Sequence, residues 1–363
     1  MKKKPAGKSP QRAPAEVLYE DELRRLAEQD TAPKPPGWKL SPKAVRAFVM
    51  GDPARGIAPK FVGHVGIVDR AMVSLMTMRG LLLIGEPGTA KSWLSELLTA
   101  AISGVSTLTI QGSAATSEEQ IKYSWNYALL LAEGPCEKAL VPGPVLTAMQ
   151  QGRIVRFEEI TRCPAEIQDC LLSVLSDRVM HIAELGEAGV VFAREGFNLI
   201  ATANTRDRGV NEMSAALKRR LSFETLFPIS DLEVELELVR KEASRLLAQT
   251  GVTAEVPKPV LQVLVTAFRE LRSGVSIDGQ PVERLSTVLS TAEAVTVAHA
   301  LGVRAAFLGD GTAHAGDILP CLSGAAVKDS ADDVEKLRRY LETVVAKRKG
   351  PEWAALYAAR SGL

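Results

Sequence analysis

Short apolar runs alternate with helical patterns between residues 60 and 229 of the chain. Such alternation is typical of a parallel sheet whose strands are connected and covered by helices. The pattern therefore predicts an α/β domain over residues 41–229. Its five strands are expected at residues 81–84, 106–111, 153–157, 197–202 and 223–227.

The pattern changes after Pro228, where no convincing strand follows. Helical periodicity begins again near Ser230, Pro257, Pro281 and Asp332. Long amphipathic segments without strands bury their apolar faces against one another. We therefore expect an all-helical second domain over residues 230–363, in which residues 301–363 form a C-terminal extension of unknown role.

The first forty residues have a different composition, rich in proline, lysine and alanine. Five Lys or Arg and no acid occur within residues 1–13, and one charged helical pattern follows at 15–27. Segments of this composition bury little apolar surface. Residues 1–40 are accordingly expected to form a basic, proline-rich tail and linker.

Composition places the chain among globular proteins, with 363 residues, 46% hydrophobic residues and a formal net charge of +1. No apolar stretch approaches the roughly 18 residues of a membrane helix. Four scattered cysteines form no C-x-x-C pair, which disfavours zinc and favours a reducing, cytoplasmic location. The near-neutral charge disfavours nucleic acid as a partner.

The stretch LLLIGEPGTAKSWL, residues 81–94, reads as a strand, a tight loop and a helix. The free N–H groups at a helix start, beside a lysine, form a phosphate-binding site. Lys91 is expected to reach the β- and γ-phosphates of a nucleotide, and Ser92 to bind Mg²⁺. The binding residues predicted here are Gly85, Glu86, Pro87, Gly88, Thr89, Ala90, Lys91, Ser92 and Trp93.

Ala90 departs from the pattern G-x-x-x-x-G-K-[ST], which has glycine at that position. The extra methyl group is tolerable if Ala90 keeps a negative φ and its Cβ points away from the phosphates. A strand-to-helix turn that merely contains Lys-Ser is the alternative.

Two adjacent acids, Glu158 and Glu159, end the apolar run of residues 152–160. Ligands of open α/β sheets bind at the carboxyl ends of the strands. One acid can hold Mg²⁺ through water while the other polarises an attacking water. Solvated acids at the start of a loop are the alternative.

Further polar residues follow the next two strands. Asn204 ends the run FNLIATANT, where a neutral amide can position water near a γ-phosphate. Lys218, Arg219 and Arg220 stand together before the last strand, and an arginine there can stabilise a phosphoryl-transfer transition state. A basic helix end that complements the helix dipole is the alternative.

The segments GEPGTAKS, RFEEI, ATANT and LKRR occur in the order and approximate spacing of Walker A, Walker B, sensor 1 and arginine finger. In this the chain resembles AAA+ ATPases, most closely those of the MoxR group, over about residues 60–300. The resemblance implies an AAA+ P-loop sheet followed by a helical lid domain. It also matches PVERLS with the start of the sensor 2 helix, which makes Arg284 the corresponding arginine.

The resemblance further implies a role for each matching residue. Glu159 becomes the catalytic base and Asn204 the sensor 1 residue. Arg220 becomes the finger that acts on a neighbouring subunit, with Arg219 as the competing choice. Glu158 stands where the family has aspartate, so whether it contacts Mg²⁺ directly stays open. Residues 61–72 lie where such ATPases have a segment that passes over the adenine, which makes Val62, Gly63 and His64 the last candidates. For His64, an ordinary surface histidine is the alternative.

These motifs together predict a cytoplasmic Mg-dependent ATPase that assembles into a ring, expected to be a hexamer, with active sites between subunits. By resemblance to the MoxR group, its work would be chaperone-like remodelling of a protein client, with a von Willebrand factor A-domain protein as a possible partner. Two alternatives stay open. One is a nucleic-acid-associated AAA+ motor or loader, and the other is a nucleotide-binding scaffold that hydrolyses ATP poorly.

Overall fold

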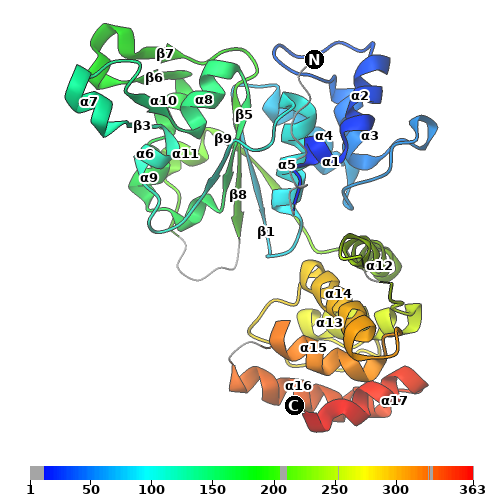
Figure 1. The fold of residues 1–363 in the computed structure, drawn as a ribbon. Helices are drawn as coiled ribbons and strands as arrows, with labels where there is room; N and C mark the ends of the chain where they lie inside the picture. Colours follow the sequence, from blue (N-terminus) through cyan, green and yellow to red (C-terminus); the bar gives the residue numbers. More distant parts are fainter. Residues whose placement is uncertain (1–11, 205–210, 252, 326, 328–329, 363) are drawn as a thin grey trace. The chain divides into compact units, whose positions relative to one another are not determined.

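Five strands of the computed structural model form one parallel sheet (Figure 1). Their order is β2-β5-β8-β1-β9, and every neighbouring pair is parallel. All five lie where the apolar runs predicted strands, so the predicted α/β fold is confirmed. The strands are β1 (Gly80–Gly85), β2 (Thr109–Gln111), β5 (Ile154–Glu158), β8 (Asn198–Asn204) and β9 (Leu221–Leu226).

The structure describes residues 12–204, 211–251, 253–325, 327 and 330–362. Contacts within the chain divide it into two compact units. The sheet unit extends to Gly85 and continues from Ala90 to Leu226, and the helical unit holds residues 86–89 and everything from Phe227 onward. The main division falls three residues before the position expected from the sequence, between 229 and 230.

Helices cover both faces of the sheet because side chains of successive strand residues point to opposite faces. Leu81 and Leu83 of β1 belong to one apolar cluster, and Leu82 belongs to the other. The first cluster is covered by α3 (Pro42–Met50), α4 (Val65–Leu75) and α5 (Lys91–Ser103). The second is covered mainly by α8 (Pro144–Gln151), α10 (Leu172–Ser176) and α11 (Ala215–Lys218).

Shorter elements complete the sheet unit. Two antiparallel pairs, β3 with β4 and β6 with β7, stand apart from the main sheet. Figure 1 shows them with α7 at the end of the unit that lies away from α1 to α4. These elements are β3 (Tyr123–Trp125), β4 (Leu140–Pro142), β6 (Val179–His181), β7 (Val190–Phe192), α6 (Glu118–Ile121), α7 (Tyr127–Glu133) and α9 (Ala165–Asp169).

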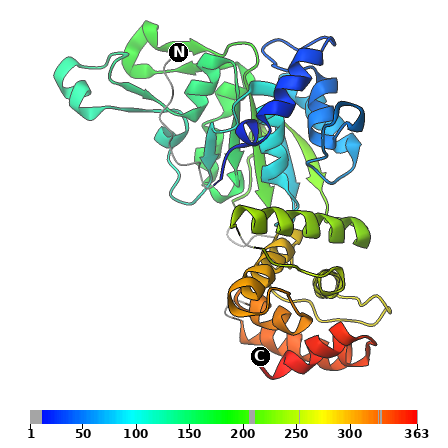
Figure 2. The ribbon, with the colours of Figure 1, turned by 45° about the vertical axis from the view of Figure 1, so that its right-hand side comes forward.

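The segment expected to be a tail and linker is folded over its described part, residues 12–40, which corrects that expectation. It forms α1 (Ala15–Leu18) and α2 (Glu20–Gln29), and α1 packs against α5 (Figure 2). Ala15, Leu26 and Trp38 are buried in the same core as β1. Apolar residues spaced three or four apart make one helical face within the charged sequence, and composition alone hid this face. Residues 1–11 lie outside the described part.

The helical unit contains α12 to α17, whose apolar faces share one core. The helix expected from Pro281 is absent, because residues 274–290 turn at Gly274 and Gly279 and α14 begins only after the Ser290 cap. The helices are α12 (Leu232–Gln249), α13 (Lys258–Ser273), α14 (Thr291–Leu308), α15 (Ile318–Ala325), α16 (Ala331–Thr343) and α17 (Pro351–Ala358). Among the described residues, no helix has the length and apolarity needed to cross a bilayer.

Truncating Leu26 to alanine tests whether the N-terminal segment belongs to the folded sheet unit. Its side chain is 1% exposed, so the change removes buried methyl groups and leaves a cavity. The free energy of unfolding, measured by urea denaturation, should fall by about 2–5 kcal/mol. The control Leu18→Ala changes a side chain that is 42% exposed and should cost no more than about 0.5 kcal/mol. Equal small effects would show that the segment is not part of the core.

Candidate functional site

Three neighbouring strands, β5, β8 and β1, end in residues that carry chemistry. Gly85 closes β1 directly opposite Asn204 at the end of β8, and Glu158 closes β5. Parallel strands bring their carboxyl ends to one edge of a sheet. The topology therefore collects Gly85, Glu158 and Asn204 on one edge of the sheet unit.

The loop after β1 turns sharply into α5, whose first residue is Lys91. Lys91 is only 7% exposed, and its Nζ donates to the carbonyl oxygen of Gly85 at 3.0 Å. Gly88 has a φ of 74°, a conformation that glycine adopts without strain. A buried ammonium beside the first N–H groups of a helix is the arrangement that binds phosphate.

Ala90 adopts a left-handed conformation, with φ 63° and ψ 25°, as the N-cap residue of α5. The expectation that it keeps a negative φ is therefore wrong. The loop has to reverse direction immediately before the helix, and this requires the conformation for which the usual motif has glycine. For an alanine this conformation costs roughly 1–2 kcal/mol.

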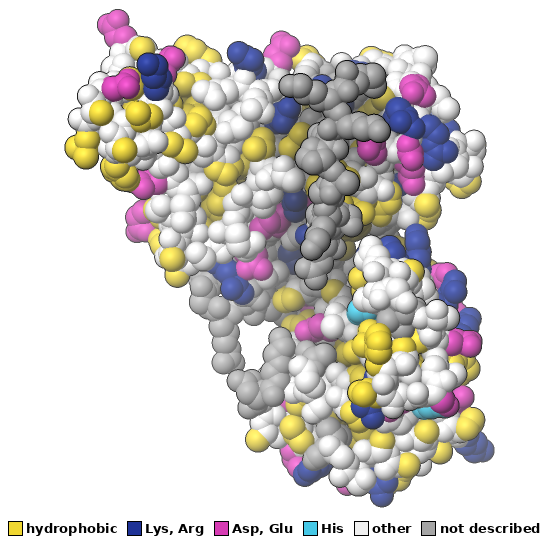
Figure 3. All heavy atoms as spheres, in the orientation of Figure 1, with side chains coloured by type: hydrophobic (Ala, Val, Ile, Leu, Met, Phe, Trp, Pro, Cys, Tyr) yellow, Lys and Arg dark blue, Asp and Glu magenta, His cyan; other side chains and the backbone are white. Residues whose placement is uncertain are grey.

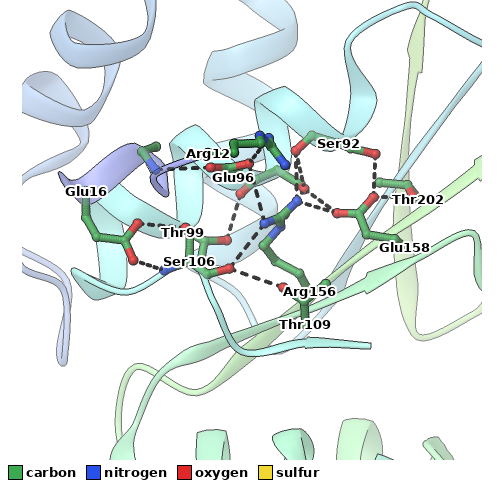
Figure 4. Close-up of polar contacts among 12 residues, drawn as sticks. Arg12, Glu16, Ser92, Glu96, Thr99, Ser106, Thr109, Arg156, Glu158 and Thr202 are labelled. Carbon is green, nitrogen blue, oxygen red and sulfur yellow. Dashed lines mark hydrogen bonds and ion pairs between the residues drawn. The ribbon is translucent and has the colours of Figure 1, made fainter. Parts of the chain in front are cut away.

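The carboxylate of Glu158 is buried and receives hydrogen bonds at both oxygens (Figure 4). The Ser92 hydroxyl donates to Oε2 at 2.6 Å, and the Thr202 hydroxyl donates to the same oxygen at 2.8 Å. The Ser95 hydroxyl lies 2.8 Å from Oε1. Glu158 is therefore not a solvated acid at the start of a loop, which was the alternative. Its carboxylate lies against the Ser92 hydroxyl in the first turn of α5.

The pKa of Glu158 reflects opposing effects. Burial raises it, because a charged carboxylate loses hydration, but the positive charge of Arg156 and the three hydroxyl groups together lower it. The net pKa lies below the usual value of the group. Glu158 is therefore an ionised acceptor at neutral pH.

Arg156, which the sequence analysis did not single out, supplies the buried charge beside Glu158. Its Nη2 donates to Oε1 of Glu158 at 2.7 Å and to the carbonyl oxygen of Ser92 at 3.0 Å. Its Nε donates to the Ser95 hydroxyl at 2.9 Å, and its Nη1 to the carbonyl oxygen of Ser106 at 3.2 Å. An arginine within an apolar strand, two residues before an acid and hence on the same face, was the available signal.

The same polar network extends to the N-terminal segment (Figure 4). Glu96 of α5 lies 3.8 Å from Nη1 of Arg156 and accepts hydrogen bonds from Nη2 of Arg12 at 2.8 Å and the backbone N–H of Ala15 at 3.0 Å. Glu16 accepts from the backbone and hydroxyl of Ser106. The N-terminal segment thus binds Glu96, which lies beside Arg156, and Arg156 in turn binds Glu158.

Glu159, the expected catalytic base, lies next to this network. Its backbone is left-handed, with φ 54°, and its N–H donates to the Thr202 hydroxyl at 3.0 Å. Its Oε2 pairs with Nε of Arg162 at 2.5 Å, and the side chain is half-buried. A non-glycine residue in this conformation is costly and is often found at functional sites. Asn204 is likewise half-buried at the end of β8.

The two candidate arginines before β9 differ in their surroundings. Arg220 donates from Nε to the Ser176 hydroxyl and from Nη1 to the carbonyl oxygen of Ala216 at 2.8 Å. Arg219 is exposed, and no hydrogen bond or ion pair of its side chain is found among the described residues. Arg220 is thus tied to its own unit, whereas Arg219 is available to another molecule.

The remaining candidates lie in different settings. The Trp93 indole donates to the carbonyl oxygen of Lys60 at 2.9 Å and contacts the Tyr19 ring, so it packs within the sheet unit. Val62, Gly63 and His64 form an exposed segment before α4, and Nδ1 of His64 accepts the N–H of Gly66 as a helix cap.

Arg284, the expected sensor 2 residue, does not begin a helix, which corrects that part of the expectation. It lies exposed in the irregular segment before α14, where its guanidinium donates to the carbonyl oxygen of Ser273 at 2.6 and 3.0 Å.

The oxygen atoms at the sheet edge suit Mg²⁺. Mg²⁺ usually takes one or two protein oxygens together with water and substrate phosphates. The Ser92 hydroxyl and the Glu158 carboxylate provide such a pair, 2.6 Å apart. No cluster of three or more His, Cys, Asp or Glu side chains suited to a metal occurs in the described part of the chain. The donor set therefore fits a metal shared with a nucleotide rather than a metal held by protein alone.

Comparison with known proteins agrees with this geometry. Residues 80–221 match the model of the AAA domain (dynein-related subfamily), and residues 233–363 match that of the YehL-like AAA+ ATPase C-terminal domain. The uncharacterized protein YehL of Escherichia coli (strain K12) is 57% identical over 354 residues, covering 97% of this chain and 98% of the relative. The chain belongs to the YehL-like AAA+ ATPases.

More distant similarities concern parts of the chain or its fold. The uncharacterized protein SH1500 of Staphylococcus haemolyticus is 28% identical over 142 residues, which cover 39% of this YehL-like ATPase and 53% of that protein. A crystal structure of NtrX from Brucella abortus in complex with ATP has a TM-score of 0.50 at 16% identity. The alignment covers 84% of this chain and 64% of NtrX, and the likeness supports the fold alone.

Replacing Ala90 with glycine tests the strain in the loop of this YehL-like ATPase. Because glycine adopts the left-handed conformation freely, the variant should gain about 0.5–1 kcal/mol in free energy of unfolding, after the entropy of the added glycine is subtracted. Urea denaturation measures the change. The control Ala101→Gly, within α5, should instead lose about 1 kcal/mol. A loss at Ala90 equal to that at Ala101 would contradict the left-handed assignment.

Proposed function

We propose that this YehL-like AAA+ protein binds Mg-ATP at the carboxyl edge of its sheet and hydrolyses it to ADP and phosphate. The observation that carries the proposal is the hydrogen bond of 2.6 Å from the Ser92 hydroxyl to the Glu158 carboxylate. It lies next to Lys91, the buried lysine at the start of α5. Membership of an AAA+ ATPase family supports the same conclusion.

Each residue at the edge has a distinct task in this proposal. The Lys91 ammonium and the N–H groups at the start of α5 bind the β- and γ-phosphates. Ser92 and Glu158 hold Mg²⁺, which when bound supplies positive charge against the phosphate oxygens. Glu159 accepts a proton from the attacking water, and Asn204 orients that water.

The proposal extends to assembly. We place the protein in the MoxR group, as a ring of subunits with a hexamer as the expected size, in which an arginine of one subunit completes the site of the next. Between the two candidates, exposure favours Arg219 over Arg220, because Arg220 already donates within its own unit. An arginine supplied by a neighbour makes hydrolysis depend on assembly.

The work driven by hydrolysis is proposed to be chaperone-like remodelling of a protein in the cytoplasm, with a von Willebrand factor A-domain protein as the expected class of partner. Apolar side chains gather on the arm formed by β3, α7 and β4 (Figure 3). Tyr127 and Leu131 of α7 are 63% and 89% exposed. Exposed apolar residues of this size suit contact with another protein. The net charge of +1 disfavours a nucleic-acid motor.

Substitutions at two residues separate binding from hydrolysis. Lys91→Ala should lower both ATP affinity and turnover, the latter by at least about 100-fold, because it removes the charge beside the phosphates. Glu159→Gln should keep ATP affinity while turnover falls by about 10²–10⁴-fold. Calorimetry measures affinity, and phosphate release measures turnover. The matched control Glu166→Gln changes an exposed acid of α9 and should affect neither.

Several outcomes would contradict the ATPase proposal. Lack of ATP binding by the unmodified chain would reject the site, and binding with negligible turnover in both the unmodified chain and Glu159→Gln would favour a scaffold. A several-fold rise in turnover on adding DNA or RNA at physiological salt would favour the nucleic-acid motor over the remodelling role.

Mixing two inactive variants tests the shared site. Arg219→Ala alone should lower turnover by about 10³-fold. Mixing it in equal amounts with Lys91→Ala should restore about a quarter of the normal rate, since in a head-to-tail ring about a quarter of sites pair an intact loop with an intact neighbouring arginine. Arg220→Ala is the control and should keep most of the turnover. Recovery with Arg220→Ala in place of Arg219→Ala would assign the finger to Arg220.

A further inference from the structure

We propose that Arg156 is a positioning residue of the nucleotide site, whose guanidinium fixes the Glu158 carboxylate so that Oε2 faces the Ser92 hydroxyl. The inference rests on the proposed function, because it names a residue that prepares the Mg²⁺ ligands of that site. Arg156 lies on β5, two residues before Glu158 and on the same face of the sheet.

The guanidinium is itself held in place. The Arg156 side chain is 9% exposed, and all three of its nitrogen atoms donate to groups of the sheet unit. Two of the acceptors are backbone carbonyl oxygens, those of Ser92 and Ser106, which move only with the chain. The planar, rigid fork of arginine transmits this fixed position to any group that it binds.

The two oxygens of Glu158 have separate partners. Oε1 accepts from Nη2 of Arg156 and lies beside the Ser95 hydroxyl, whereas Oε2 accepts from Ser92 and Thr202. Arginine therefore occupies the oxygen that faces away from Ser92 and leaves the other toward it. Glutamate has one more side-chain torsion than the aspartate found at this place in similar ATPases, so it has more rotamers to exclude.

Charge reinforces the arrangement. Arg156 faces two carboxylates, Glu158 at 2.7 Å and Glu96 at 3.8 Å. Both acids are buried, and a buried carboxylate that loses its partner of opposite charge is strongly destabilised where it lies and turns toward solvent. Without Arg156, Glu158 would thus no longer be held in the orientation that presents Oε2 to the metal. The loss would act on the metal-dependent part of nucleotide binding and leave the phosphate contacts of Lys91 in place.

Equilibrium titration with a fluorescent ATP analogue tests this without relying on turnover. The measured quantity is the ratio of affinity in Mg²⁺ to affinity in EDTA. Arg156→Met should lower this ratio by about tenfold or more, as expected when a residue that orients a metal ligand is lost, while affinity in EDTA changes by no more than about threefold. Arg156→Lys, which keeps the charge but not the fork, should give an intermediate ratio.

Arg178→Met is the matched control. Arg178 is a half-buried arginine of the sheet unit, and its guanidinium donates to the backbone carbonyl oxygens of Phe197 and Met78 rather than to Glu158. Its loss should leave the ratio within about twofold of the unmodified protein. Circular dichroism checks that each variant is folded. Should Arg156→Met fail to fold, the lysine variant carries the test, because it retains the buried charge.

The outcomes separate the two levels of the argument. An unmodified protein that binds the analogue in neither Mg²⁺ nor EDTA would overturn the proposed function and this assignment together. If the unmodified protein binds the analogue, an unchanged ratio of affinity in Mg²⁺ to affinity in EDTA in the folded Arg156 variants would overturn the role of Arg156 alone. An equal fall in the Arg178 variant would also overturn it, by showing that loss of an arginine elsewhere in the sheet unit disturbs the site.

Discussion

The hydrogen bond between the Ser92 hydroxyl and the Glu158 carboxylate joins the two parts of the candidate site. One part is the start of α5 and the other is the end of β5, and β5 is separated from β1 by β8. The strand order β2-β5-β8-β1-β9, in which strands that are distant in sequence are neighbours in the sheet, brings these parts together. Everything proposed for phosphate, Mg²⁺ and water depends on this edge being assembled before a ligand arrives.

The charges behind the edge need the rest of the sheet unit. Glu158, Arg156 and Glu96 lie in an interior where an unpaired charge is strongly unfavourable, and each has a partner of opposite sign. The N-terminal segment completes the series, because Arg12 and the N–H of Ala15 bind Glu96. A segment that looks dispensable by composition thus covers the polar interior next to the site.

Much of the fold could be predicted from the sequence, because apolar runs such as residues 81–84 and 197–202 correspond to strands that are buried on both faces of the sheet. The grouping of Gly85, Glu158 and Asn204 followed from the rule on strand ends. The left-handed backbone conformation of Ala90 could not be predicted from that rule, because the turn into α5 imposes it. Arg156 was missed because its partners Ser95 and Ser106 are distant in sequence and meet only in the folded sheet.

The most direct test of the central claim is a crystal structure of the protein with Mg²⁺ and a non-hydrolysable ATP analogue. The account predicts the triphosphate in the loop of residues 85–92, with Mg²⁺ at the Ser92 hydroxyl and Oε2 of Glu158 facing it directly or through water. A nucleotide bound elsewhere in the chain, or a Glu158 carboxylate turned away from Ser92 with the nucleotide in place, would contradict the account.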